Sequence, residues 1–200
     1  MSEKRLQDRL NDFEDLMKSV KILTKQGTAN EMQFYIFDYD PKDELKVRDQ
    51  IAKVKRINSE IVEFDLYDMI IEIVKNEGYF ESIIKIEKEY PKEVMLNQMI
   101  DPLLALEENE NAVMDIFKKR ALDNGKSIVL ITGVGKAYPI IRSHTILNNL
   151  HSVFNKNPVV MMYPGRYETE SRSNMSLNLF EKLGDDNYYR AFPLVGRGDK

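Results

Sequence analysis

The sequence predicts a single α/β domain in which a mostly parallel sheet of about five strands is flanked by helices. Two observations lead to this fold class. Short apolar runs bounded by Gly or Pro are typical of buried strands, and amphipathic helical segments alternate with them along the chain. A chain of 200 residues is long enough to bury one real core. We therefore expect residues 1–195 to form one domain and residues 196–200 to be a flexible tail.

The chain begins with a predicted helix that ends near Gly27. The apolar residues of this helix recur at three- and four-residue spacing; they are Leu6, Leu10, Phe13, Leu16, Met17 and Val20. Residues 34–37 follow as a buried strand, because all four are aromatic or β-branched. Asp40 is expected to cap the next helix, with Pro41 in its first turn, and residues 61–66 form the second strand.

A helical insertion is predicted between the second and third strands, over about residues 67–123. Its amphipathic segments are separated by Gly78, Pro91 and an acidic loop at 107–110. An insertion of this kind packs against the sheet or docks another protein, and the sequence leaves both interpretations open. The amphipathic segments are residues 68–75, 79–89 and 112–122.

The remaining strands are expected over residues 128–132, 159–163 and 189–195. The first two are apolar runs bounded by Gly or Pro, and a helix is predicted between them from Pro139 to about Leu150. Strand–helix–strand units form parallel sheets. In such sheets the functional residues usually lie in the turns that follow the strands.

The composition excludes several classes of protein. The chain has no cysteine, which removes disulfides, thiolate chemistry and Cys-based zinc sites. Its first 26 residues are rich in charge, unlike a signal peptide. No apolar run approaches the about 20 residues that span a bilayer. We expect a cytoplasmic protein with no membrane contact.

The overall charge argues against non-specific binding to duplex DNA, since the net charge is −4 and the pI is about 5.4. The window 126–172 differs, because it holds six Lys and Arg against Glu168 and Glu170. A nucleic-acid-binding module would use this window, whereas scattered, solvated charges explain the same excess. We therefore expect any contact with DNA to be indirect.

The turn after the third predicted strand superficially resembles a phosphate-binding loop. The sequence GVGK at 133–136 follows an apolar run. The Walker A pattern, however, requires Gly where Leu130 stands and Ser or Thr where Ala137 stands. We therefore expect a nucleotide-binding-type fold without a P-loop and without a bound cofactor.

Carboxylates crowd the turn after the first predicted strand. Asp38, Asp40, Asp43 and Glu44 lie within seven residues, where they would repel a triphosphate. Helix capping explains most of them, and contact with a basic partner is the alternative. A divalent metal also prefers clustered oxygen ligands.

A metal-dependent nuclease or phosphohydrolase is therefore an alternative function. Its ligands would be Asp38, Asp40 and Asp43, or else Asp185 and Asp186. Stabilisation of the fold by the metal would distinguish this hypothesis from simple capping.

No catalytic constellation is evident from the sequence. The two histidines, His144 and His151, are too far apart on a predicted helix to ligate one metal as an i, i+4 pair does. Ser143 is adjacent to His144, which directs their side chains apart on a helix. We expect no catalytic, cofactor or metal site.

Tyrosines and arginines gather in two stretches near the C-terminus. This composition is typical of protein interaction hot spots, and it also suits stacking on unpaired bases. We favour protein contacts. The predicted partner-binding residues come from these stretches and from the acidic turn; they are Arg166, Tyr167, Arg172, Tyr188, Tyr189, Arg190, Asp38, Asp40 and Asp43.

Five longer motifs carry a resemblance to a known family. They read FYIFDYDPKDELKVRDQI from residue 34, ITGVG from 131, RSHTILNNL from 142, PVVMMYPGRY from 158 and DDNYYRAF from 185. In this order and spacing they resemble the BrxB family of bacteriophage-exclusion (BREX) systems. The resemblance covers most of the chain and is weakest over about 65–124.

The resemblance implies a role in excluding phage. It also implies partners: a PglZ-like protein of the alkaline-phosphatase superfamily, a BrxC-like ATPase and the PglX methyltransferase. Because the chain has no recognisable parts for ATP hydrolysis, methyl transfer or DNA cleavage, we expect a non-catalytic adaptor or scaffold subunit, and not an enzyme.

Overall fold

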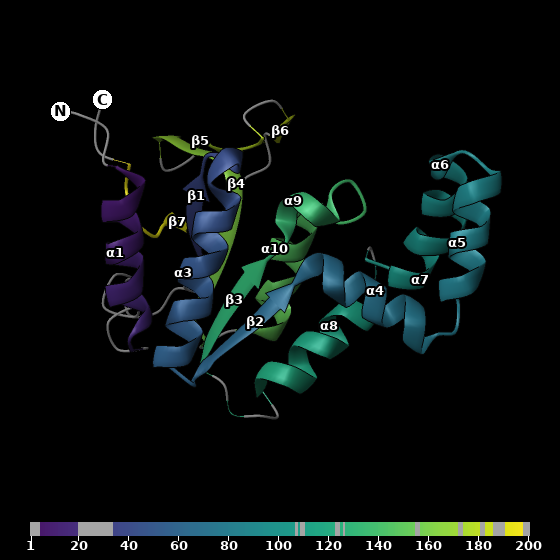
Figure 1. Ribbon diagram of the computed structural model, residues 1–200, viewed down its shortest axis with the longest axis horizontal. Helices are drawn as coiled ribbons and strands as arrows, with labels where there is room; N and C mark the ends of the chain where they lie inside the picture. The colour runs from purple at the N-terminus through teal and green to yellow at the C-terminus, as the bar shows by residue number, and fades with distance from the viewer. Residues whose placement is uncertain are drawn as a thin grey trace.

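A central sheet lies between two layers of helices (Figure 1). The protein is described here from a computed structural model. The described residues are 5–19, 34–106, 108, 111–122, 125, 127–154, 157–171, 174–180, 183–185 and 191–197. In this part of the chain, no helix is long and apolar enough to cross a membrane.

The sheet confirms the predicted fold class. Its five parallel strands lie in the order β2-β3-β4-β1-β7. The strands are β1 (Phe34–Tyr39), β2 (Ile61–Asp65), β3 (Ile128–Thr132), β4 (Val159–Ser171) and β7 (Phe192–Pro193). The apolar runs of β1, β3 and the first half of β4 are buried on both faces, which is typical of parallel strands covered by helices.

Strand β4 is longer than the predicted 159–163. Its first half pairs with β1 and β3, and its second half continues as an antiparallel ladder with β5 (Asn174–Leu179). Strand β6 (Leu183–Asp185) then pairs with β5. The expected turn at Pro164 is therefore part of a strand, because β5 supplies Gly165 with a cross-strand neighbour in Leu179.

Helices α1 (Leu6–Met17) and α3 (Glu44–Ile57) cover one face of the sheet. Phe13 of α1 packs on Phe37 of β1 with their ring centroids 5.4 Å apart. On α3, Val47, Ile51 and Val54 are the buried residues, and their three- and four-residue spacing forms one stripe. The Asp40 side chain accepts a hydrogen bond from the Lys42 amide, which confirms the predicted cap.

The opposite face is covered by α4 (Leu66–Asn76), α8 (Ala112–Phe117), α9 (Val134–Ala137) and α10 (Ser143–Val153). Phe64 of β2 and Phe117 of α8 lie at the centre of this core, with ring centroids 4.3 Å apart. The helix predicted from Pro139 begins instead at Ser143, after the short helix α9.

The predicted insertion between β2 and β3 is helical. Figure 1 shows α5, α6 and α7 on the side of α4 away from the sheet. Beyond α4 and α8, the insertion contains α5 (Phe80–Glu89), α6 (Lys92–Met95), a π-helical turn (Leu96–Ile100), α7 (Asp101–Leu104) and a second π-helical turn (Lys118–Leu122).

Three predictions concern segments that the structure describes only in part: the end of the first helix, the last strand and the C-terminal tail. Gly27, the expected end of the first helix, lies outside the described residues, as do residues 189–190 of the strand predicted over 189–195. The described part of that strand is β7 at 192–193. The expected loose tail does not include Arg197, because its guanidinium binds Asp38.

Candidate functional site

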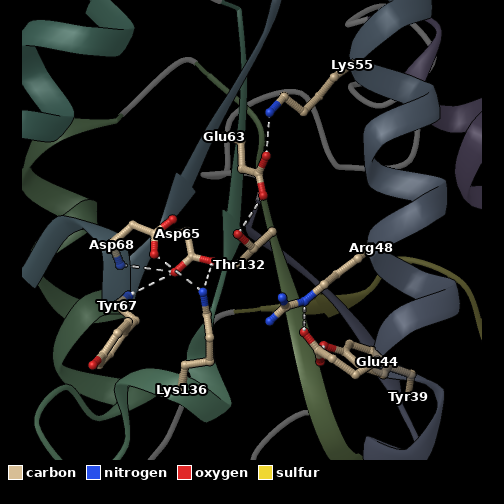
Figure 2. Close-up of polar contacts among 10 residues, drawn as sticks. All are labelled: Tyr39, Glu44, Arg48, Lys55, Glu63, Asp65, Tyr67, Asp68, Thr132 and Lys136. Carbon is tan, nitrogen blue, oxygen red and sulfur yellow. Dashed lines mark hydrogen bonds and ion pairs between the residues drawn. The ribbon is translucent and has the colours of Figure 1, made fainter. Parts of the chain in front are cut away.

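A cleft of about 240 Å³ opens at the carboxyl end of the sheet, on the face covered by α3. Open α/β sheets bind their ligands at this end. The polar residues that line the cleft come from three strands and from α3, α4 and α9; they are Tyr39, Glu44, Arg48, Lys55, Glu63, Asp65, Asp68, Thr132 and Lys136 (Figure 2).

The strand geometry places these polar side chains on one face. Side chains alternate between the faces of a strand, so Ile61, Glu63 and Asp65 of β2 share the α3 face while Phe64 enters the opposite core. Thr132 takes the equivalent position at the end of β3, where it pairs with Asp65 in the parallel register. The cleft is therefore a consequence of polar residues alternating into the carboxyl ends of buried strands.

Glu63 joins α3 to β3 across the cleft. Lys55 Nζ lies 2.5 Å from Glu63 Oε2, and Thr132 Oγ1 donates to Glu63 Oε1 over 2.8 Å. Figure 2 shows the carboxylate of Glu63 between these two side chains. Both carboxylate oxygens of Glu63 therefore have partners inside the protein.

The carboxylate of Asp65, the last residue of β2, lies against the turn at 133–136, whose sequence superficially resembles a phosphate-binding loop. Its Oδ1 caps α4 by accepting the amides of Tyr67 at 3.1 Å and Asp68 at 3.2 Å. Its Oδ2 lies 2.6 Å from Lys136 Nζ. Gly133 is so close to this carboxylate that a Cβ there would stand 2.3 Å from Asp65 Oδ1. The carboxylate thus takes the place beside Gly133 and Lys136 that a phosphate would need.

A third polar group lies on the α3 side of the cleft. Tyr39 O–H donates to Glu44 Oε2 over 2.6 Å, and Arg48 Nε donates to Glu44 Oε1 over 2.8 Å. Burial raises the pKa of Tyr39 far above its ordinary value, and the hydrogen bond to Glu44 raises it further. The bond to Glu44 also raises the pKa of Arg48. Tyr39 is therefore neutral and Arg48 cationic at physiological pH.

The balance of charge limits what the cleft can bind. Its three cations, Arg48, Lys55 and Lys136, each pair with a carboxylate of the cleft itself. A triphosphate would have to displace these internal carboxylates before any cation could reach it. The expectation of a nucleotide-binding-type fold without a P-loop agrees with this arrangement.

The structure changes the interpretation of Asp38. Its side chain is buried, with the residue only 6% exposed, and its Oδ1 accepts from Arg9 Nη2 over 2.7 Å. Its Oδ2 accepts from Arg197 Nε over 2.8 Å and from the Tyr167 amide over 3.2 Å. Asp38 is therefore a structural residue inside the molecule, because internal donors already occupy both oxygens.

The other two acidic candidates are partly exposed and do not converge with Asp38; the side chain of Asp40 is 36% exposed and that of Asp43 is 14% exposed. Asp40 lies 2.5 Å from Lys42 Nζ, and hydrogen bonds from Lys42 lower the pKa of Asp40. Asp43 lies 2.7 Å from Lys46 Nζ. Among the described residues, no group of three or more His, Asp or Glu side chains is placed to hold a metal ion. The described residues therefore do not support the metal-site hypothesis at 38–43.

Of the tyrosine and arginine candidates, the structure describes Arg166 and Tyr167. Tyr167 packs against the core and donates its hydroxyl to Ala191 O over 2.6 Å. Arg166 lies beside it at the start of the antiparallel part of β4, in register with Asn178. The candidates that lie outside the described residues are Arg172, Asp186, Tyr188, Tyr189 and Arg190. For Asp185, His144 and His151 only the backbone is described.

Sequence reasoning singled out Glu44 and Lys136 but missed the other polar residues that line the cleft. Arg48 and Lys55 lie in the helix predicted after Asp40, where nothing in the sequence separates them from its other charged residues, and Thr132 is the last residue of an apolar run. One signal was present in β2, where Glu63 and Asp65 alternate with apolar residues. Charges at alternate positions of a strand indicate one polar face.

Comparison with known proteins identifies the relatives of this chain. The family model "BREX protein BrxB" matches residues 62–194. A BREX protein BrxB of Bacillus cereus (strain H3081.97) is 39% identical over 97% of this chain and 100% of its own length. A BREX protein BrxB of Escherichia coli O9:H4 (strain HS) is 30% identical over 95% of this chain and 92% of its own. No solved structure matches.

Proposed function

The chain belongs to the BrxB family of BREX proteins and so to an anti-phage defence system, and from this membership we propose that it is a non-catalytic adaptor subunit. An adaptor binds other subunits and leaves ATP hydrolysis, methyl transfer and DNA cleavage to them. The role of the adaptor's fold is then to present binding surfaces to those subunits.

The observation that carries this proposal is the ion pair between Asp65 and Lys136. The carboxyl end of an α/β sheet is where this class of fold places its chemistry. Here the lysine of the GVGK turn is 2.6 Å from a carboxylate of the same chain, which also caps α4. An internal ion pair at this point supports a structural use of the turn.

The family resemblance suggests which partners the adaptor holds. We infer a PglZ-like subunit and a BrxC-like ATPase, with the PglX methyltransferase as a further candidate. Contact with DNA would then be made mainly through these subunits, in the cytoplasm. This agrees with the net charge of −4, since a surface that binds duplex DNA directly is usually strongly basic.

Affinity purification tests the adaptor role. The tagged chain is expressed together with its neighbouring genes, and the retained proteins are identified by mass spectrometry after nuclease treatment. We expect at least one other BREX subunit in a fixed ratio that nuclease does not change. A chain that elutes alone under these conditions contradicts the proposal.

A charge reversal tests the predicted arginine surface. Changing Arg166, Arg172 and Arg190 together to Glu should reduce the amount of partner retained while the circular dichroism spectrum is unchanged. The matched control reverses three exposed lysines of the insertion; they are Lys85, Lys88 and Lys92. Equal retention by both triple variants would remove the arginine assignment and leave the adaptor role intact.

A further inference from the structure

Among the described strands, β2 lies at one edge of the sheet and pairs with β3 alone. The amide of Ile128 donates to Glu60 O over 3.2 Å, and Ile61 is in register with Ile128. Backbone bonding alternates along a strand. The peptide groups of Val62 and Phe64 therefore point to β3, and the amides of Glu63 and Asp65 point outward.

A hollow of about 190 Å³ lies along this outer edge, lined by Glu63, Asp65, Asp68, Met69 and Arg120. It shares Glu63, Asp65 and Asp68 with the larger cleft on the α3 face. The edge is thus bordered by a hollow on its outer side and by the cleft on one face. An extended segment laid along β2 would have room for its side chains in both.

The charge around β2 defines the kind of segment that fits. Between Ile57 and Val74 the chain carries five carboxylates and no Lys or Arg. Three of these carboxylates pair with cations from other elements, Lys55, Arg120 and Lys136. The other two are Glu60 and Asp68. Asp68 shares Lys136 with Asp65, since its Oδ1 lies 3.5 Å from Lys136 Nζ, and its side chain is 75% exposed. Five carboxylates against three cations leave an excess of two negative charges.

Exposed apolar side chains stand at both ends of the strand. Ile57, four residues before β2, is 49% exposed, and Tyr67, two residues after it, is 38% exposed. Exposed edge strands are usually protected by charged side chains, above all Lys, or by Pro; β2 contains no Lys or Pro, and both of its charges are acidic. Its acidic side chains would instead repel the β2 of a second copy, which argues against self-pairing.

We propose that the outer edge of β2 binds an extended, Lys/Arg-rich segment of another protein chain by adding it as a strand to the sheet. Main-chain hydrogen bonds to Glu63 and Asp65 supply affinity in this mode, and side-chain pockets supply selectivity. Basic residues of the segment face Asp68 and Glu60. The proposal rests on the adaptor function, because it names the surface through which the adaptor holds a partner.

The comparison of Glu63→Pro with Glu63→Ala tests whether the outward amide of Glu63 binds the partner. Both substitutions remove the side-chain contacts of Glu63 with Lys55 and Thr132. Only proline also removes the outward amide, and it leaves the ladder bonds to β3 intact because the Glu63 amide does not take part in them. We expect Glu63→Ala to retain the co-purified subunit and Glu63→Pro to lose at least tenfold of it. Equal retention by the two variants overturns the edge proposal while the adaptor function stands.

Hydrogen exchange on the wild-type protein keeps the proposal testable if Glu63→Pro does not fold. The amides of Glu63 and Asp65 should exchange at least tenfold more slowly in the purified complex than in the free chain. Unchanged exchange at both amides in a complex that does form also overturns the edge proposal. A wild-type chain that retains no subunit overturns the adaptor function and the edge proposal together, so the two failures are distinguishable.

Discussion

Arg9 donates a 2.7 Å hydrogen bond from its guanidinium to the carboxylate of Asp38, and both residues are almost completely buried. The contact joins α1 to the end of β1. Arg197 donates to the other oxygen of the same carboxylate, and a second of its nitrogens donates to Gly165 O over 2.8 Å. One carboxylate therefore ties the first helix and the C-terminal segment to β1, the strand beside the central strand β4.

Asp38→Ala should lower the free energy of unfolding by about 3–5 kcal/mol, because it removes the carboxylate partner of a buried arginine. Urea denaturation measures the change. Asp40→Ala is the matched control: it removes an exposed carboxylate two residues away, and we expect a loss of about 1 kcal/mol from the cap. Equal losses from the two variants would contradict the structural role assigned to Asp38.

The burial of Asp38 shows where prediction from sequence stopped. The strands at 34–37, 61–66 and 128–132 could be predicted because a local run of apolar and β-branched residues is enough to indicate a buried strand. Asp38 continues the first of these runs, and its charge suggested a surface position. Its partners Arg9 and Arg197 lie 29 and 159 residues away in the chain. Nothing in the local pattern indicates which distant cation will neutralise a buried carboxylate.

The second half of β4 and the cleft were missed for related reasons. Pro164 and Gly165 are typical turn residues, so the strand was expected to end there, yet the pairing with β5 carries it on to Ser171. The cleft residues come from separate elements and meet only after the sheet has formed. The pairing of β2 with β3 brings Asp65 beside Thr132, and the order of strands in a sheet cannot be predicted from the sequence pattern alone.

Gly133→Ala tests the close approach of the Asp65 carboxylate. Gly133 has φ +71°, and a Cβ would lie 2.3 Å from Asp65 Oδ1. Gly78 has a similar φ of +76° with nothing within 4 Å of its would-be Cβ, so Gly78→Ala measures the backbone strain alone. We expect about 1 kcal/mol of destabilisation at Gly78, and about 1–3 kcal/mol more at Gly133 from steric overlap. Equal melting temperatures for the two variants would show that the carboxylate moves away without cost.

Tyr39→Phe should change how stability depends on high pH. The pKa of Tyr39 is raised in the folded protein, first by burial and then by its hydrogen bond to Glu44. The stability that Tyr39 contributes is therefore fully present below its unfolded pKa, about 10, and is lost as the pH rises above it. At neutral pH the variant should be less stable by about 1–2 kcal/mol, because the hydrogen bond is gone.

Above pH 10 this difference should shrink, since only the wild-type protein has Tyr39 to ionise. Urea midpoints measured from pH 7 to about 11 follow the effect. Tyr79→Phe is the control, because Tyr79 is 48% exposed and none of the described hydrogen bonds involves its hydroxyl. A constant difference between wild type and Tyr39→Phe across the whole range would contradict the prediction.

Asp65→Asn tests whether the internal ion pair blocks the GVGK turn. Asparagine keeps an oxygen to cap α4 but removes the charge that holds Lys136. We expect pyrophosphate to leave the melting temperature of the wild-type protein unchanged and to raise that of Asp65→Asn with increasing concentration, because a ligand that binds the folded state stabilises it. Adding Lys136→Met to Asp65→Asn should abolish the shift, since the released lysine is then absent. A concentration-dependent shift in the wild-type protein would mean that the cleft accepts phosphate despite its carboxylates, and the main support for a non-catalytic adaptor would be lost.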